Sequence, residues 1–287
     1  MNRYHLGLGG YTIHQMQNQT DSQMTGYVIA CPDGGAVVVD GGVREAAPRL
    51  RQLLWEAGGH VRLWLLTHFH HDHVSAPLEI LAHPDGLRID RVCALPVPAA
   101  LRQPGFETSD PLAERFASLG LTEEAADGRP ALLRADAGLT VTAGGLEIEC
   151  LNDPLRIVRE PWLDVQDFHV NDSSAVYLVR FPNGRTALFP GDIGPGLSGR
   201  LADELGGRLR ADVCQMSHHG QNGACERFYA CVRPSFCFWD APDWLWDNDA
   251  GQGFGTGPWK TLAVRAWMAK LGVIRHAAQA FGENLLD

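Results

Sequence analysis

The chain alternates between short apolar runs and segments with helical spacing, which predicts a protein of mixed α/β structure. Continuous apolar runs that end at turn residues are typical of buried strands, and apolar residues three or four positions apart are typical of helices. Strands are predicted at 26–30, 36–40, 61–66, 89–95, 174–181, 186–189, 211–216, 235–239 and 274–277, with a hairpin over 139–151. Helices are predicted at 45–57, 74–82, 112–119, 197–205, 225–232 and 260–271.

No linker is long enough to divide the chain, so we expect a single domain over residues 1–287. Its C-terminal part, 240–287, combines a Trp- and Gly-rich segment with a helix and the last strand. The segment 240–259 has two interpretations: a flap that covers a functional site, or a loop whose Trp side chains pack on the final helix.

The histidines are unevenly distributed, and their clustering indicates a metal site. Four of the 12 histidines fall between His68 and His73, directly after the predicted strand 61–66. Residues two apart in an extended segment point the same way, so His68 and His70 can reach one ion. Asp72 and His73 follow where a helix begins and can reach a second point nearby; spacing alone also allows His71 to act with His73. Imidazoles with a carboxylate suit Zn, Mn or Fe, whereas a surface His run would not be expected between a strand and a helix.

The composition of the chain limits the kinds of molecule that it is expected to bind. Lys and Arg number 24 and Asp and Glu 34, a net charge of −10, which disfavours general binding to nucleic acids or anionic membranes. No run of 18 apolar residues exists, and the first residues lack the apolar core of a secretory signal. The seven cysteines, an odd number, do not indicate a disulfide framework. We therefore expect a cytoplasmic protein that acts on a small molecule.

Four motifs occur in an order that resembles a known family. They are Asp40-Gly41-Gly42, His68-x-His70-x-Asp72-His73, Gly191-Asp192 and Ser217-His218-His219-Gly220. Their order and spacing over about residues 10–240 resemble the metallo-β-lactamase superfamily, and most of all the branch that includes the hydrolase domain of the DNA-uptake channel protein. The resemblance implies a single metallo-hydrolase domain with a four-layer αββα sandwich, in which two mixed sheets are flanked by helices.

The resemblance also implies how the ligands divide between two divalent ions. His68 and His70 would hold the first ion, and Asp72 and His73 the second. Asp192 would bridge both. The ions would be Zn, with Mn and Fe as alternatives.

Two positions in this ligand set stay open. His219 would complete the second ion's site, with His218 as the alternative; otherwise His218 would contact the substrate as a catalytic residue. The third ligand of the first ion would be His169, which precedes the predicted strand 174–181, but Asn171 and Asp172 compete with it.

The implied reaction is hydrolysis by a hydroxide that bridges two ions. Asp72 would orient this hydroxide and pass a proton to the leaving group. Asp40 would either receive an imidazole N–H or serve as a turn residue at the end of its strand. The expected substrate is a phosphodiester or a small phosphate ester; the alternatives are a lactone or another cyclic ester or amide, and a redox or sensing role on the same scaffold.

Overall fold

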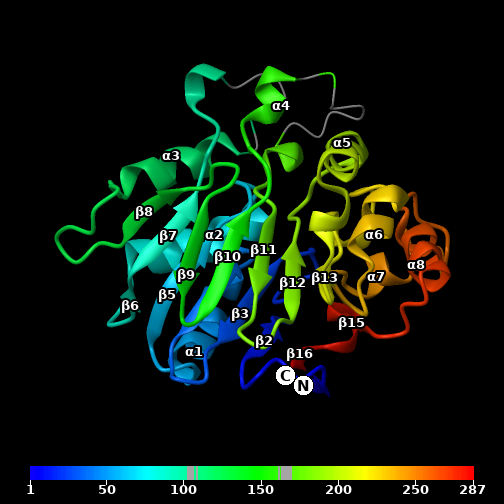
Figure 1. Ribbon diagram of the computed structural model, residues 1–287, viewed down its shortest axis with the longest axis horizontal. Coiled ribbons are helices and arrows are strands. Elements are labelled where there is room, and N and C mark those ends of the chain that lie inside the picture. The colour runs from blue at the N-terminus through cyan, green and yellow to red at the C-terminus, as the bar shows by residue number, and fades with distance from the viewer. Residues whose placement is uncertain (102–106, 108, 161, 163–169) are drawn as a thin grey trace.

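Two β-sheets lie face to face, and helices cover the outer face of each (Figure 1). The structure is a computed structural model that describes residues 1–101, 107, 109–160, 162 and 170–287. The two chain ends lie together below the sheets in Figure 1, where the first and last strands pair in parallel.

Within the residues that the structure describes, the first sheet has nine strands. They are β1 (Asn2–Tyr4), β2 (Thr12–Gln15), β3 (Gly26–Ala30), β4 (Ala36–Asp40), β5 (His60–Leu65), β6 (Arg88–Ile89), β7 (Arg91–Ala94), β8 (Ala131–Arg134) and β16 (Asn284–Leu286). Their order is β1-β16-β2-β3-β4-β5-β7-β8, with β6 beside β5. Strands β4, β5, β7 and β8 run parallel, whereas β16, β2, β3 and β4 alternate in direction, so the sheet is mixed.

The second sheet is also mixed and has seven strands in the described part of the chain. They are β9 (Thr140–Ala143), β10 (Leu146–Cys150), β11 (Tyr177–Arg180), β12 (Thr186–Phe189), β13 (Val213–Gln215), β14 (Phe236–Trp239) and β15 (His276–Ala278), in the order β15-β14-β13-β12-β11-β10-β9. Strands β12 to β15 run parallel, and β9 to β12 are antiparallel.

The alternation of side chains along each strand creates three apolar layers. In β4, Val37 and Val39 point into the core between the sheets, and Val38 points outward. In β14, Phe238 points inward and Trp239 outward. The outer layer of the first sheet is covered by α1 (Ala47–Glu56), α2 (His71–Ala82) and α3 (Asp110–Ser118), and that of the second by α5 (Pro195–Leu205), α6 (Glu226–Val232) and α8 (Thr261–Lys270). Two short helices, α4 (Arg156–Arg159) and α7 (Asp243–Trp246), lie in the connections.

The αββα sandwich confirms the predicted fold class. The helices lie within a few residues of their predicted ranges, but 89–95 divides at Asp90 into β6 and β7. The prediction that a strand at 274–277 is the last one is wrong, because β16 follows it and pairs with β1 and β2. All seven cysteines are free thiols. Within the described residues, no helix has both the length and the apolar character that crossing a membrane requires.

Candidate metal centre

The predicted chemical residues come together at one edge of the sandwich, where several strands end. Asp40 ends β4, and the segment from Thr67 to His70 follows β5 in the first sheet. Asp192 follows β12, and His219 follows β13 in the second sheet. Because carboxyl ends of parallel strands meet at one edge, residues far apart in sequence can converge there.

The start of α2 is fixed to the end of β4 by an irregular first turn. Pro77 has no N–H, so it cannot donate to the carbonyl of His73, four residues earlier. That carbonyl instead accepts the N–H of Gly42 at 3.1 Å, and the N–H of Ala76 donates to the Gly42 carbonyl at 3.1 Å. The turn that carries Asp72 and His73 is thereby held against β4, and the carboxylate of Asp72 is favoured at the helix N-terminus.

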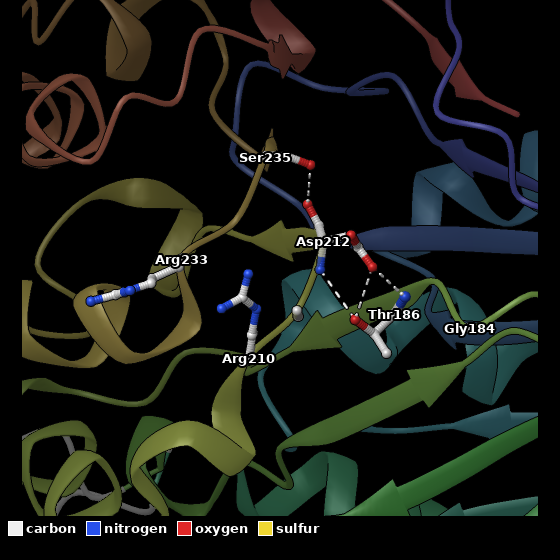
Figure 2. Close-up of a pocket in the computed structure, with 7 residues that line it drawn as sticks. Gly184, Thr186, Arg210, Asp212, Arg233 and Ser235 are labelled. Atoms are coloured by element: carbon white, nitrogen blue, oxygen red, sulfur yellow. Dashed lines mark hydrogen bonds between the residues drawn. The ribbon is translucent and has the colours of Figure 1, made fainter.

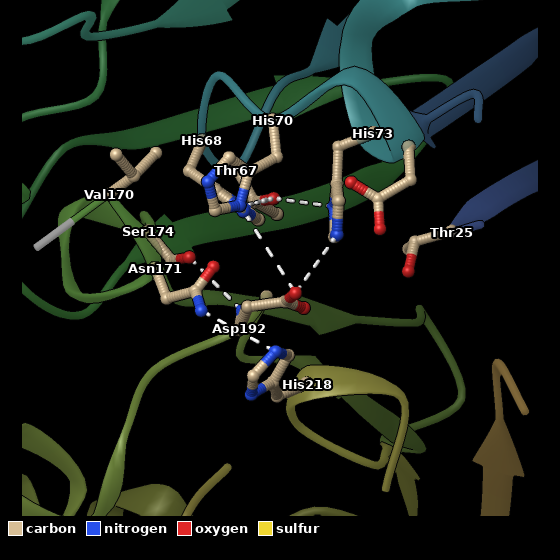
Figure 3. A network of polar contacts seen from close by, with 12 residues as sticks. Thr25, Thr67, His68, His70, His73, Val170, Asn171, Ser174, Asp192 and His218 are labelled. Carbon is tan, nitrogen blue, oxygen red and sulfur yellow. Dashed lines mark hydrogen bonds and ion pairs between the residues drawn. The ribbon is translucent and has the colours of Figure 1, made fainter. Parts of the chain in front are cut away.

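Asp192 is the centre of the cluster (Figure 3). Its Oδ2 atom lies 3.2 Å from His73 Nε2, 3.3 Å from His219 Nε2 and 3.9 Å from His68 Nε2. Asp72 Oδ2 lies 3.2 Å from His219 Nε2. Two overlapping groups have all their ligand atoms within 4.8 Å of one another. They are His68, His73 and Asp192, and Asp72, His73 and His219.

The donor atoms of the cluster fit divalent ions. Within the described residues, His73 Nε2, His219 Nε2 and Asp192 Oδ1 are buried and make no hydrogen bond. The other ring nitrogens are engaged: His73 Nδ1 lies 2.8 Å from Asp40 Oδ2, and His219 Nδ1 lies 3.1 Å from the carbonyl oxygen of Asp240. A proton on each Nδ1 leaves an Nε2 lone pair directed at the cluster, which is how imidazoles bind metal ions.

The electrostatics favour cations at this point. Burial alone would lower the pKa of His219, but the charges of Asp192 and Asp72 raise it to about 10. Burial likewise opposes the raised pKa of His73, which Asp192 and Asp40 hold well above its ordinary value. For Asp192, burial is outweighed by His73 and His219, which hold its pKa well below the usual range. The negative potential that attracts protons here also attracts divalent ions.

Asp40 takes the first of its two expected roles. Its Oδ2 accepts hydrogen bonds from His73 Nδ1 and from the Thr67 hydroxyl at 2.7 Å, and its Oδ1 accepts the Thr67 N–H at 2.8 Å. Asp40 therefore fixes both the ring of His73 and the start of the His-rich loop.

The remaining His-loop residues differ in their placement. His70 Nδ1 lies 3.0 Å from His68 Nε2, so His70 borders the cluster without belonging to either group of three. His71 has 68% of its side chain exposed, while His73 is buried, so these two do not face one ion.

The residues with open assignments lie on the other side of Asp192. The ring of His219 reaches the carboxylates, whereas His218 Nε2 lies 3.4 Å from Asn171 Nδ2. Burial lowers the pKa of His218 to about 4, so its imidazole is neutral at pH 7. Asp172 Oδ1 accepts the N–H of Gly194 at 2.6 Å, a structural contact. His169 lies outside the described residues.

Sequence reasoning missed the groups that hold Asp192 and His219 from behind. The N–H of Asp192 donates to Ser174 Oγ at 3.0 Å, and the carbonyl of Asp240 receives His219 Nδ1. Asp240 directly follows the apolar strand β14, as Asp40 ends the apolar strand β4. The same pattern of an acid at the end of a buried strand could have identified Asp240.

The Trp-rich segment packs largely on itself and on α8. The rings of Trp244 and Trp259 have centroids 4.8 Å apart, and the guanidinium of Arg265 in α8 lies 4.1 Å from the Trp246 ring centroid. Trp244 Nε1 donates to the carbonyl of Asp21 at 2.9 Å.

A hollow of about 420 Å³ lies at the opposite ends of the strands (Figure 2). It is lined by Gly184, Thr186, Arg210, Ala211, Asp212, Arg233 and Ser235. Thr186 begins β12, and Asp212 and Ser235 precede β13 and β14, so the hollow is at the amino ends of these strands. The Arg210 and Arg233 side chains point in different directions in Figure 2. The candidate metal centre lies at the carboxyl ends of the strands, so this hollow is not part of it.

Comparison with known proteins identifies the same region. Residues 20–85, which include Asp40 and the His-rich loop, match the family described as the metallo-beta-lactamase superfamily. No curated protein sequence matches the chain.

Solved structures give the fold. The metallo-beta-lactamase fold protein YhfI from Bacillus subtilis is 12% identical with a TM-score of 0.54, over 93% of this chain and 95% of that one. CmlA, a diiron beta-hydroxylase from Streptomyces venezuelae, is 14% identical with a TM-score of 0.53, over 93% of this chain but only 52% of that one. A metallo-beta-lactamase with a HARLDQ motif from Cronobacter sakazakii is 16% identical with a TM-score of 0.43, over 70% of this chain and 75% of that one. At these identities, the two likenesses with TM-scores above 0.5 show a shared fold.

The family match covers the His-rich loop, and the fold brings that loop against one acid and one histidine from the second sheet. Together these findings make the chain similar to the metallo-beta-lactamase superfamily in its His-rich loop and in its fold.

Proposed function

We propose that the protein is a binuclear metal-dependent hydrolase that cleaves a phosphodiester or a small phosphate ester. The observation that carries this proposal is the position of Asp192 Oδ2, within 3.9 Å of ring nitrogens from three histidines in both sheets. A carboxylate so placed can be shared by two ions and offsets their mutual repulsion. Two bound ions would supply Lewis acidity, which lowers the pKa of water and stabilises charge on the ester oxygens.

The two groups of three define how the chain would hold the ions. His68, His73 and Asp192 form one group, and His219 joins Asp72 and His73 in the other. His70 lies beside His68 and adds an imidazole to the first group. A further ligand for this group would come from His169, Asn171 or Asp172. Asn171 Oδ1 is buried and makes no hydrogen bond within the described residues.

Asp72 has a second task in this proposal. Burial would raise its pKa, but the close contact with His219 and the charges of His73 and His219 hold it below the usual range. An ionised carboxylate accepts a hydrogen bond from the attacking water, orients it, and can then carry its proton to the leaving group. The side chain of Asp72 is almost completely buried, so the proton would pass to the leaving group through this carboxylate and not through bulk water.

His218 is placed to contact the substrate. It lies beside Asn171 on the side of Asp192 away from the His-rich loop (Figure 3). Its imidazole is neutral at pH 7, so it can donate one N–H to an ester oxygen without bringing a positive charge. We assign His218 to substrate binding and His219 to ion binding.

The choice of a phosphate ester depends on the Ser217-His218-His219-Gly220 motif, whose resemblance to the DNA-uptake branch is part of this proposal. The charge of the site makes binding of such a substrate depend on the ions. The buried Asp40, Asp72 and Asp192 would repel an anionic substrate, so it would bind only once cations had reversed the local potential.

The test is a metal and substrate panel. The protein is loaded with Zn²⁺, Mn²⁺ or Fe²⁺, bound metal is measured, and turnover is followed on bis-p-nitrophenyl phosphate, a lactone and a chromogenic cephalosporin. Asp192→Asn removes the shared carboxylate, and His71→Ala is the matched control because its exposed ring lies in the same loop.

We expect about two ions per chain and cleavage of the phosphodiester by the wild type and by His71→Ala, with loss of both in Asp192→Asn. Cleavage of the lactone alone would replace the phosphate ester with a cyclic ester as substrate. A wild-type protein that binds no divalent ion would contradict the proposal as a whole.

A further inference from the structure

A buried acid that belongs to neither group of ligands lies beneath the candidate metal centre. Asp240 follows β14 and is fully buried. Its Oδ1 accepts hydrogen bonds from Gln15 Nε2 at 2.9 Å and the Tyr27 hydroxyl at 2.7 Å. Its Oδ2 accepts hydrogen bonds from the Thr25 hydroxyl at 3.1 Å and Gln215 Nε2 at 3.3 Å. One carboxylate therefore receives four donors, three from the first sheet and its adjoining loop and one from the second sheet.

This network reaches His219 directly. The main-chain carbonyl of Asp240 lies 3.1 Å from His219 Nδ1 and accepts its proton. That contact selects the tautomer in which Nε2 faces Asp72 and Asp192. The carbonyl and the four-times hydrogen-bonded side chain belong to the same residue, directly after the end of β14.

The network reaches Asp72 through Thr25. The Thr25 hydroxyl donates to Asp240, and the Thr25 N–H donates to the carbonyl of Asp72 at 2.9 Å. Figure 3 shows Thr25 beside the helix turn that carries His73. The first turn of α2 is thus connected to the end of β14 by one residue.

The network reaches Asp192 through Gln215. The amide nitrogen of Gln215 donates to Asp240, and its Oε1 accepts the N–H of Gly191 at 3.1 Å. Gly191 directly precedes Asp192 and has φ +59°, a conformation that the loop needs to turn the carboxylate toward the cluster. An added Cβ at Gly191 would lie 2.8 Å from the Ser174 side chain, so a larger residue does not fit at this position.

We propose that Asp240 is a positioning residue that sets the mutual distances of Asp72, Asp192 and His219 by joining both sheets beneath them. The inference depends on the proposed function, because it concerns the same ions. An acid in this position costs desolvation that an apolar residue would avoid, so its contribution is to specify one arrangement of its neighbours. A purely structural Asp240 would affect the stability of the sandwich but leave the ion affinity of the folded protein unchanged.

Three variants and one control separate these possibilities. Asp240→Asn removes the charge with little change of shape, while Tyr27→Phe and Thr25→Val each remove one donor and leave the carboxylate in place. Tyr11→Phe is the control, because the buried Tyr11 hydroxyl donates to the carbonyl of Gly144, outside this network.

Co²⁺ is the probe, because its visible spectrum reports the geometry of its ligands. Affinity is measured by competition with a chromophoric chelator, and folding by circular dichroism. We expect Asp240→Asn to weaken the binding of the second ion by about 10- to 100-fold, the range seen when hydrogen-bond partners of metal ligands are removed. Tyr27→Phe and Thr25→Val should shift the Co²⁺ spectrum and weaken binding less, and Tyr11→Phe should match the wild type.

The outcomes distinguish this inference from the proposed function. If Asp240→Asn does not fold, the two donor variants decide. Folded variants with wild-type affinity and spectrum would overturn the positioning role while leaving the hydrolase proposal intact. A wild type that binds Co²⁺ but cleaves no substrate would leave the positioning role testable by the same spectra, and a wild type that binds no ion would overturn both.

Discussion

The glycine that follows His219 provides the sharpest test of the geometry. Gly220 has φ +82°, and an added Cβ would overlap Cε3 of Trp239 and lie 2.6 Å from its Cζ3. The Trp239 ring is fully buried, and its Nε1 donates to His276 Nδ1 at 3.1 Å, so it has little freedom to move. Gly220→Ala should therefore displace the preceding His219.

A matched glycine isolates the two costs. Gly184 has φ +85° with nothing within 4 Å of an added Cβ, so Gly184→Ala carries only the cost of a left-handed backbone, about 1–2 kcal/mol. Gly220→Ala carries the same cost plus overpacking, about 1–3 kcal/mol more. Changes in the unfolded chain are equal for the two variants and cancel. At about 2–4 °C per kcal/mol, Gly220→Ala should melt roughly 2–12 °C below Gly184→Ala.

Thermal unfolding by circular dichroism and Zn²⁺ affinity by chelator competition are the assays. Gly220→Ala should lose at least about tenfold in affinity because His219 moves, whereas Gly184→Ala should bind as the wild type does. Equal melting temperatures and equal affinities in the two variants would refute the inference that the Trp239 ring fixes His219.

Four further outcomes are expected. Asp72→Asn should lose turnover and bound metal, measured by hydrolysis and elemental analysis, and full activity would contradict its role. Chelation of the wild type should lower the melting temperature by roughly 8–16 °C for each ion that is present at about 1,000 times its Kd. In metal-stripped protein, the pKa of His219 is raised from 6.5 to about 10. The stabilisation that protonated His219 gives the folded state is therefore complete below about pH 6.5 and declines as the pH rises. Urea unfolding should give a lower free energy of unfolding at pH 8.5 than at pH 7, and His219→Gln should reduce this difference. Zn²⁺ binding at pH 7 should release a proton from His219, so calorimetric heats should vary with the ionisation enthalpy of the buffer, and buffer-independent heats would argue against this.

The sequence predicts those elements whose pattern is local. Strand β4 and strand β14 are continuous apolar runs, and α2 begins where the His-rich loop ends, so each can be recognised within a few residues. Strands β1 and β16 have three residues each, which is too short for any period to be visible. They form because the two ends of the chain pair with each other, and no local sequence pattern reveals a pairing between such distant segments.

The site divides in the same way. His68, Asp72 and His73 lie close together in the sequence, where a strand ends and a helix begins, and their spacing alone indicates ion binding. That Asp192 and His219 face them is a consequence of sheet topology, which only the resemblance to a family anticipated. The choice among His169, Asn171 and Asp172 stays a prediction.

Two acids at strand ends connect the fold to the chemistry. Asp40 ends β4 in the first sheet and accepts the proton of His73 Nδ1 through its carboxylate; Asp240 follows β14 in the second sheet and accepts that of His219 through its carbonyl. Each sheet therefore fixes one imidazole through its Nδ1 atom, the first sheet His73 and the second His219. The relative position of their two Nε2 atoms depends on how the sheets pack. The ring of Tyr27, 5.2 Å from Phe189 across that interface, both fills the core and donates to Asp240. Core packing and ligand geometry are thus determined by the same side chains, so a substitution between the sheets should affect ion binding before it unfolds the protein.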